Sequence, residues 1–473
     1  MANPRSFAAL VAALVWLPLV CAAQETNLAA SWLRGEIIDP VVAVADTGQS
    51  YALYLPPDYD PSRRWPLILA LDPAARGRVP VELLRPAAEK YGYIVAGSNN
   101  SRNGPLKPQT EAFQQMWNDV LERFAIDEHR IYAAGFSGGA RLATLMGHLC
   151  QRCLAGVLSS GAGFSPSVPV TADIPFAFFS VLGHYDFMYA EVVELLEKLD
   201  AAGIPYALRT FDGAHQWAPP EVLTEGVEWL ELIALGRGRR PPDDAFIEAQ
   251  WRMREATARA REEQQQWLEA YRTYKEMETA FVGLRDVTDV TAKIRALQES
   301  KELRAALKEQ ARAVEKQLLQ TRPIAEQLGA LREATAERTA LAADVRNRVA
   351  HLRRRREREK NPDETAILRR SLGYIFALYF ESGEGMLRAK DYPTAAVYFQ
   401  VAAEAAPRSS GVEYNIACAY ARSGRTKDAL AALRRAVEKG FSDAALLESD
   451  HDLDSLRDLS EFQQIQQSLP APP

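Results

Sequence analysis

The stretch Ala133-Ala134-Gly135-Phe136-Ser137-Gly138-Gly139 decides the fold of this chain. Apolar residues 131–134 predict a buried strand, and residues 140–146 predict the start of a helix. The five residues 135–139 therefore fit a G-x-S-x-G pattern on a strand-to-helix turn. Small residues are needed there because the serine sits on a strained backbone, and bulkier neighbours would block the approach to its hydroxyl oxygen. The pattern predicts Ser137 as a nucleophile at the head of a helix, where developing negative charge is favoured.

A nucleophilic serine needs a base, and the base needs an acid that orients it. An apolar run at 175–182 is followed closely by Asp186, and a later strand-like stretch at 205–211 is followed by His215. These residues keep the order serine, acid, histidine, each at the end of a later strand. We predict Ser137 as the nucleophile, His215 as general base and then acid, and Asp186 as the residue that orients His215.

The same residues have other interpretations. Asp186 is also placed to cap the helix that follows it, and His215 is also placed to be a buried structural histidine. Asp212 is the alternative acid, although three residues before the base it is better suited to shape the turn. His184 is nearer to Asp186, but it has the wrong strand position and is expected only to line the pocket.

The surrounding residues predict one α/β fold between about 36 and 235. Strand signals at 51–59, 66–73 and 93–97 alternate with helix signals at 81–91 and 110–124. The run 66–73 is apolar throughout, as the central strands of parallel sheets are. This alternation predicts a parallel sheet with right-handed crossovers.

The domain resembles an α/β-hydrolase of the esterase type, similar to the feruloyl esterase and polyhydroxybutyrate depolymerase group. The segments that carry this resemblance are 54–57, 127–132, 135–139, 183–186 and 213–215. The resemblance implies hydrolysis of a small carboxylic ester through an acyl-enzyme, with no cofactor and no metal. It covers about two-fifths of the chain.

The chain departs from that group at the oxyanion hole. In the group, a His-Gly pair after the third strand positions one oxyanion-hole amide, and the residue after the nucleophile supplies the other. Here Asp72 and Pro73 stand in place of His and Gly. Because Pro73 has no N–H to donate, the resemblance leaves Ala74 as the donor beside Gly138.

The N-terminus predicts export. Arg5 precedes an apolar stretch at 7–20 and a small-residue site, which indicates a signal peptide at 1–23 cleaved after Ala23. The apolar stretch is too short for a stable membrane span, and no second long apolar segment follows. A lipoprotein signal at Cys21 is the alternative. We therefore expect a periplasmic or secreted protein, in which Cys150 and Cys153 form a local disulfide rather than a metal or redox site.

The composition changes after the α/β domain at 24–235. Residues 236–244 are rich in Gly, Pro and charge and predict a linker, and 245–360 carry apolar residues at helical spacing, typical of a long, coiled-coil-like helical region. Pro323 and Gly329 are expected to mark a break within it. Residues 361–473 resemble tetratricopeptide repeats, because Ala395 and Ala429 stand 34 positions apart in matching registers.

Two functions from different classes follow. The first is an exported serine hydrolase whose helical half binds a protein partner or self-associates. We expect this hydrolase to be an esterase, and a peptidase of related fold is the other enzyme that the pattern allows. The alternative is a partner-binding scaffold protein with a weak or inactive hydrolase domain. The arginine run at 353–358 predicts a solvated helix end rather than a nucleic-acid site, because the net charge is -6 and export separates the chain from the genome. The short segment 161–175 holds no inserted lid, which favours an open pocket.

Overall fold

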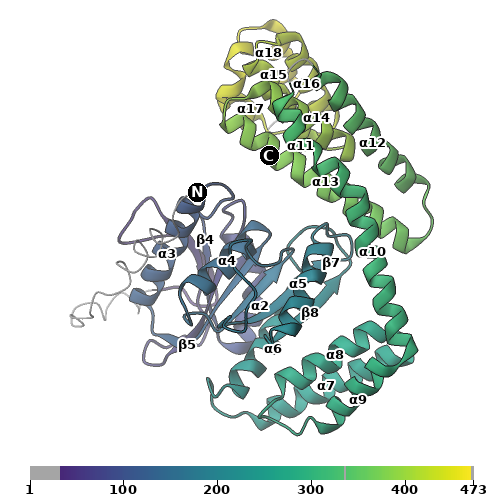
Figure 1. Ribbon diagram of the computed structural model, residues 1–473. Helices are drawn as coiled ribbons and strands as arrows, with labels where there is room; N and C mark the ends of the chain where they lie inside the picture. The colour runs from purple at the N-terminus through teal and green to yellow at the C-terminus, as the bar shows by residue number, and fades with distance from the viewer. Residues whose placement is uncertain (1–31, 335–336, 470–473) are drawn as a thin grey trace, which may run out of the picture.

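The computed structural model describes residues 32–334 and 337–469, so the predicted signal peptide at 1–23 lies outside the described residues. Figure 1 shows an α/β unit, a group of lower helices beside it, and a C-terminal module above it. The lower helices are α7 (Asp244–Glu263), α8 (Trp267–Ala280) and α9 (Thr288–Glu299). The long helix α10 (Lys301–Ala325) runs from the lower helices to the C-terminal module, which comprises α11 to α18.

The α/β unit contains one eight-stranded sheet in the order β1-β2-β4-β3-β5-β6-β7-β8. Strands β1 and β2 pair antiparallel, β2 pairs antiparallel with β4, and the other neighbouring strands are parallel. The strands are β1 (Ile37–Val42), β2 (Ser50–Tyr54), β3 (Trp65–Leu71), β4 (Ile94–Ser98), β5 (Ile126–Phe136), β6 (Gly156–Ser160), β7 (Ala177–Gly183) and β8 (Tyr206–Phe211). This is the fold of the α/β-hydrolases, as predicted.

Helices cover both faces of the sheet, which explains why its central strands are apolar on both sides. One face packs on α2 (Arg78–Tyr91) and α6 (Pro220–Gly236), and the other on α3 (Leu106–Arg123), α4 (Gly138–Leu149) and α5 (Tyr189–Ala201). Strands β3 and β7 are buried at every position. The carboxyl ends of the parallel strands then meet at one edge, where the loops carry Ser137, Asp186 and His215.

Residues 236–244, expected as a linker, do not separate two independent bodies. They form a turn between α6 and α7, where Arg240 pairs with the buried Glu231 of α6 and with Asp243. The lower helices then continue the core of the sheet, because Met277 and Phe281 belong to the same buried cluster as Trp229 of α6. The sequence signal for a linker came from Gly, Pro and charge, but these residues here form an ion-paired turn.

The region 245–360 is helical, as predicted, yet its long helices do not run as one coiled-coil pair. Helix α10 packs on α8 and α9 near its start and on α13 (Pro362–Arg388) further along. It ends at Ala325, close to the break expected between Pro323 and Gly329, and α11 (Gln327–Glu333) and α12 (Arg338–Arg358) follow. None of the described helices is long and apolar enough to cross a membrane.

The C-terminal module is built from antiparallel helix pairs. Helix α13 packs on α14 (Tyr392–Ala405), and α15 (Ser410–Arg422) packs on α16 (Thr426–Glu438). The small residues Ala395 and Ala429 are fully buried, and a side chain at Gly383 would collide with the ring of Phe399. Close helix approach therefore explains the 34-residue pattern, whereas membership of the tetratricopeptide family stays a prediction. The remaining elements are α17 (Ala444–Ser449), a short 3-10 helix (His451–Leu456) and α18 (Ser460–Gln467).

Candidate active site

Ser137 lies on a sharp turn between β5 and α4. Its backbone has φ 51° and ψ -119°, a region that a residue with a side chain rarely adopts. The glycines around it permit this turn: a Cβ on Gly139 would overlap the carbonyl oxygen of Leu71, and one on Gly135 would overlap the backbone of the first turn of α4. The strained serine and its two crowded glycines are the geometry that the sequence pattern predicted.

The three predicted side chains form one hydrogen-bonded chain. The hydroxyl oxygen of Ser137 lies 2.9 Å from Nε2 of His215, and Nδ1 of the same ring lies 2.9 Å from Oδ1 of Asp186. The Asp186 side chain is fully buried, and the His215 side chain is 19% exposed. The alternative residues Asp212 and His184 are exposed and take no part in this chain. The imidazole is thus placed to take a proton from the serine, with Asp186 fixing its orientation.

Asp186 also holds the backbone just before α5, although Met188 and not Asp186 is the N-cap residue of that helix. Its Oδ1 accepts a hydrogen bond of 2.9 Å from the backbone N–H of Met188, immediately before α5. The same oxygen therefore orients His215 and fixes the start of α5. The two contacts of this oxygen are compatible, since a carboxylate oxygen has two lone pairs.

Aromatic rings hold the imidazole of His215 on two sides. The ring centroid of Phe187 lies 4.1 Å from that of His215, and the centroid of Phe136 lies 4.7 Å from it. Gly161, after β6, has φ 67°, and a Cβ there would approach Asp186 and His215 to about 3 Å. A glycine at that position leaves room for the acid and base to meet.

The oxyanion side of the site differs from the prediction. Gly138 begins α4, so its N–H belongs to the first helical turn, whose amides have no partner within the helix. The N–H of Ala74, however, donates a 2.9 Å hydrogen bond to Oδ1 of Asp72. Because that amide is already engaged, Ala74 is not a free oxyanion donor, and this assignment is corrected. Close to Gly138 lies the side chain of Asn103, whose nearest atom is the acceptor oxygen Oδ1.

Asp72 is a buried carboxylate that the sequence analysis missed as a site residue. It accepts hydrogen bonds from the Arg76 guanidinium (2.9 Å twice), from Nε1 of Trp217 (2.8 Å) and from the Ala74 amide. Burial acts to raise the pKa of the Asp72 carboxyl, but these hydrogen bonds outweigh burial and hold it below its ordinary value. Trp217 stands two residues after His215, so Asp72 anchors the loop that carries the base. The unusual Asp-Pro pair after β3 was the sequence feature that could have indicated a special role for Asp72.

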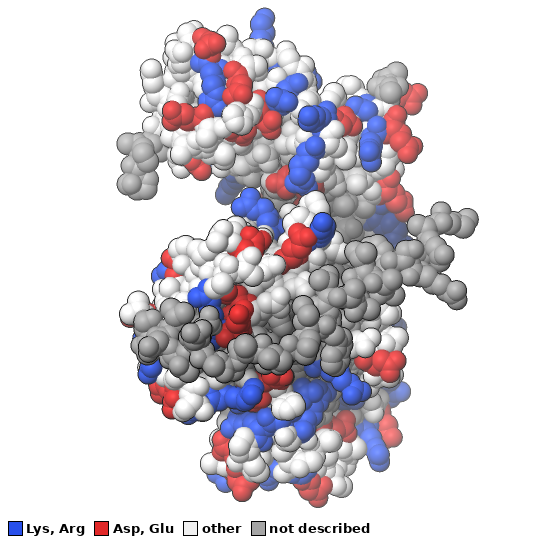
Figure 2. Space-filling view, turned by 90° about the vertical axis from the view of Figure 1, so that its left-hand side faces the viewer, with Lys and Arg blue, Asp and Glu red and all other residues white. Residues whose placement is uncertain are grey.

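Helix α13 of the C-terminal module reaches this site, which the sequence did not indicate. Arg370 of α13 donates a 2.8 Å hydrogen bond to the carbonyl oxygen of His184. Further along the helix, burial raises the pKa of the Glu381 carboxyl, while the charges of His215 and Arg141 oppose that rise. The segment 161–175 contains no helix or strand, but α13 of the C-terminal module contacts the loop that carries Asp186. Figure 2 shows that the molecule narrows between the C-terminal module and the α/β unit, and that both parts carry charges of both signs.

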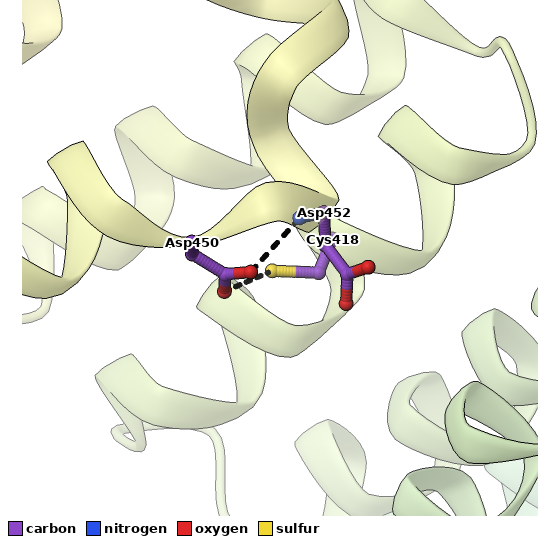
Figure 3. Close-up of side chains that lie close together, drawn as sticks. All are labelled: Cys418, Asp450 and Asp452. Carbon is purple, nitrogen blue, oxygen red and sulfur yellow. Dashed lines mark hydrogen bonds between the residues drawn. The ribbon is translucent and has the colours of Figure 1, made fainter.

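Cys150 and Cys153 are joined by a disulfide directly after α4, remote from the catalytic chain. The remaining described cysteine, Cys418 on α15, lies near Asp450 and Asp452 (Figure 3). Their ligand atoms lie within 4.8 Å of one another.

Hydrogen bonds account for the arrangement in Figure 3. Oδ1 of Asp450 accepts from the backbone N–H of Asp452 at 2.9 Å, which caps the 3-10 helix. Oδ2 of Asp450 accepts from the Tyr414 hydroxyl at 2.7 Å. Burial raises the pKa of the Cys418 thiol, so it stays protonated and is a poor metal ligand. The cluster therefore stabilises the C-terminal module and forms no part of the site.

The fold and the site together define a class: an α/β-hydrolase fold with a serine, histidine and aspartate in hydrogen-bonded order. Comparison with known proteins gives one family match, to the N-terminal domain of A/B hydrolase-like proteins, over residues 386–469. These residues run from the end of α13 to just after α18, so the match lies on the C-terminal module and not on the sheet. No curated protein matches the chain.

Several solved structures are similar to part of this chain. An S-formylglutathione hydrolase from Staphylococcus aureus is 13% identical, with a TM-score of 0.35 over 42% of this chain and 98% of that one. A ferulic acid esterase is 17% identical, with a TM-score of 0.35 over 42% and 98%. A carboxylesterase from Bacillus cereus is 16% identical, with a TM-score of 0.33 over 40% and 96%.

Proposed function

We propose that this protein is a serine hydrolase that cleaves small carboxylic esters through an acyl-enzyme. The observation that carries the proposal is the continuous chain from Ser137 through His215 to Asp186, with both hydrogen bonds at 2.9 Å. A serine hydroxyl is a weak nucleophile unless an adjacent base removes its proton, and this chain provides that base.

Each residue then has a distinct step in the reaction. The hydroxyl oxygen of Ser137 attacks the ester carbonyl carbon while Nε2 of His215 takes its proton. The imidazolium returns this proton to the departing alcohol, which leaves an acyl group on Ser137. A water molecule, activated by the same nitrogen, then hydrolyses the acyl-enzyme and regenerates the serine. Asp186 orients the imidazole and stabilises the imidazolium in both half-reactions.

The oxyanion that forms in each half-reaction needs hydrogen-bond donors. The N–H of Gly138 supplies one, since it stands at the head of α4 beside Ser137. The Ala74 amide is engaged by Asp72, so we assign Gly138 alone and leave the second donor unassigned. An oxyanion-hole donor contributes a few kcal/mol.

The test is turnover of a panel of p-nitrophenyl esters of increasing acyl length. Ser137→Ala is expected to lower kcat by at least about 10³-fold, because it removes the nucleophile. Ser62→Ala, on an exposed loop of the α/β unit, serves as the matched control and keeps full activity. Turnover unchanged by Ser137→Ala would remove the catalytic assignment, and no turnover by any form would favour the scaffold function.

The location and the partner of the protein belong to the same proposal. We place it outside the cytoplasm, in the periplasm or secreted, on the strength of the N-terminal signal pattern and the Cys150–Cys153 disulfide. The C-terminal module is proposed to bind a protein partner or a second copy. Because its family match is described as a domain of A/B hydrolase-like proteins, the module and the hydrolase unit are expected to work together.

A further inference from the structure

The loop that carries the catalytic acid is held by helices from outside the α/β unit. This acid loop, residues 183–189, joins β7 to α5. From α10, the side-chain amide of Gln317 donates a 2.9 Å hydrogen bond to the carbonyl oxygen of Phe187, and that of Gln310 donates one of 3.0 Å to the Tyr189 hydroxyl. From α13, the Arg370 guanidinium donates to the carbonyl oxygen of His184. Two of these contacts fix backbone carbonyls on either side of Asp186, and the third holds the side chain of Tyr189.

Arg370 is the charged residue among these three contacts, and it is buried. Only 8% of the residue is exposed, and its guanidinium carbon lies 3.6 Å from the ring centroid of Tyr189. A buried cation is costly unless hydrogen bonds, an aromatic face or an opposite charge compensate it. Burial lowers the pKa of Arg370, whereas Tyr189 and the carboxylate of Asp186 oppose that shift.

The carboxylate of Asp186 carries the charge opposite to that of Arg370. Oδ1 of Asp186 already accepts from His215 and Met188. Oδ2 of Asp186 is buried and has no hydrogen-bond partner among the described residues 32–334 and 337–469. A buried carboxylate oxygen without a hydrogen bond is costly unless an opposite charge compensates it. Arg370 supplies that charge from the C-terminal module.

The packing beside Arg370 continues to the base. Gly373, one helical turn further along α13, faces Phe187, whose side chain would lie 3.4 Å from a Cβ at that position. The ring of Phe187 packs against that of His215, tilted by 38°, with 4.1 Å between the ring centroids. A contact path therefore runs from α13 through Phe187 to the imidazole.

We propose that Arg370 is a positioning residue for the catalytic acid, so that the C-terminal module completes the active site instead of being appended to it. The inference rests on the proposed function, since it assigns Asp186 as the acid. Arg370 touches no reacting atom and acts through the His184 carbonyl and the charge of Asp186. Active-site geometry tolerates little displacement, because a shift of about 1 Å can cost roughly 100-fold in rate.

The experiment compares Arg370→Met, Arg370→Lys and Arg388→Met in the full chain. Methionine keeps much of the side-chain volume but removes the charge and the hydrogen bond. Arg388 lies exposed near the end of the same helix and is the matched control. We measure kcat and KM for p-nitrophenyl acetate, hydrogen-deuterium exchange of residues 183–189, and the melting temperature of each form.

Arg370→Met is expected to lower kcat roughly 10- to 100-fold with little change in KM, and to speed exchange in the acid loop. Arg370→Lys restores the charge and is expected to recover part of kcat and the slow exchange. A lower melting temperature with normal kcat and normal exchange would make Arg370 merely structural and overturn the proposal.

The exchange measurement separates this inference from the proposed function. If the wild-type protein shows no ester turnover, the proposed function fails, yet exchange still decides whether Arg370 holds the loop. Exchange in residues 183–189 that is the same in Arg370→Met, Arg388→Met and wild type overturns the positioning role. Faster exchange in Arg370→Met alone supports it.

Discussion

The proposed nucleophile and the proposed acid of this site are held in two different ways. Ser137 is fixed by its own neighbours, since Gly135 and Gly139 allow the strained turn and Leu71 of the adjacent strand closes it. The acid loop is fixed from a distance, by Gln310, Gln317 and Arg370, which lie 121 to 186 positions from the residues they bind. Local backbone geometry thus positions Ser137, whereas packing against distant helices positions Asp186. Changes in the helical half should therefore affect catalysis through Asp186 and not through Ser137.

The largest effect on kcat is expected from substitution of Asp186. In Asp186→Asn, the side-chain oxygen still accepts from Met188, but an amide no longer stabilises the imidazolium or favours the correct tautomer of His215. We expect kcat for p-nitrophenyl acetate to fall by roughly 10⁴-fold, with a melting temperature close to that of the wild type. Asp212→Asn, on the same edge of the sheet and exposed, is the control. Equal losses in the two variants would contradict the assignment of the acid.

The next effect concerns how the lower helices are joined to the sheet. Glu276 of α8 is buried and binds Arg209 of β8 and Arg254 of α7. Burial acts to raise the pKa of Glu276, but the two arginines lower it to about 2. Glu276→Ala leaves two buried cations without this carboxylate, so we expect the free energy of unfolding at pH 7 to fall by about 3–5 kcal/mol.

The pH dependence of this effect has a defined sign. Because the pKa of Glu276 is lower in the folded chain than its ordinary value of 4.5, its contribution is complete above about pH 4.5 and is lost as the pH falls toward 2. The difference between wild type and Glu276→Ala, measured by denaturant unfolding, should therefore narrow on acidification. Glu255→Ala, which breaks an exposed pair with Arg259, should cost under about 1 kcal/mol at either pH. A constant difference from pH 7 to pH 3 would contradict this account.

A smaller effect is expected at the loop that carries the base. Trp217→Phe keeps the ring beside Phe136 but removes the N–H that donates to Asp72. Loss of a hydrogen bond to a buried carboxylate should lower the free energy of unfolding by about 1.5–3 kcal/mol, measured by denaturant unfolding at pH 7. Trp267→Phe, at a half-buried indole on α8, is the comparison. If both substitutions cost the same, Asp72 does not anchor the loop.

The contrast between the two regions also explains what the sequence could predict. The α/β fold, the elbow at Ser137 and the positions of Asp186 and His215 follow from local patterns: apolar strands, a glycine-rich turn, and polar residues at strand ends. The prediction of Ala74 as the second oxyanion donor was wrong, because the N–H of Ala74 donates to Asp72. That contact depends on the conformation of the loop after β3. A helical pattern shows which face is apolar but not what it packs against.

The helical half was therefore the part least accessible to prediction. The Gly, Pro and charge content of 236–244 indicated a linker, yet Arg240 turns back to the buried Glu231. The stripe in 245–360 predicted helices correctly but could not show that Met277 and Phe281 complete the core of the sheet. Nothing near Arg370 in the chain indicates an active site, because its partner His184 lies 186 positions away.

The most direct test of the central claim is covalent trapping of the nucleophile. The intact protein is treated with a fluorophosphonate, digested, and analysed by mass spectrometry for the modified residue. We predict a single adduct on Ser137 that is absent in Ser137→Ala and forms far more slowly in Asp186→Asn, because phosphonylation needs the same activated hydroxyl. An adduct on another residue, or an unlabelled Ser137 in folded protein, would contradict the account.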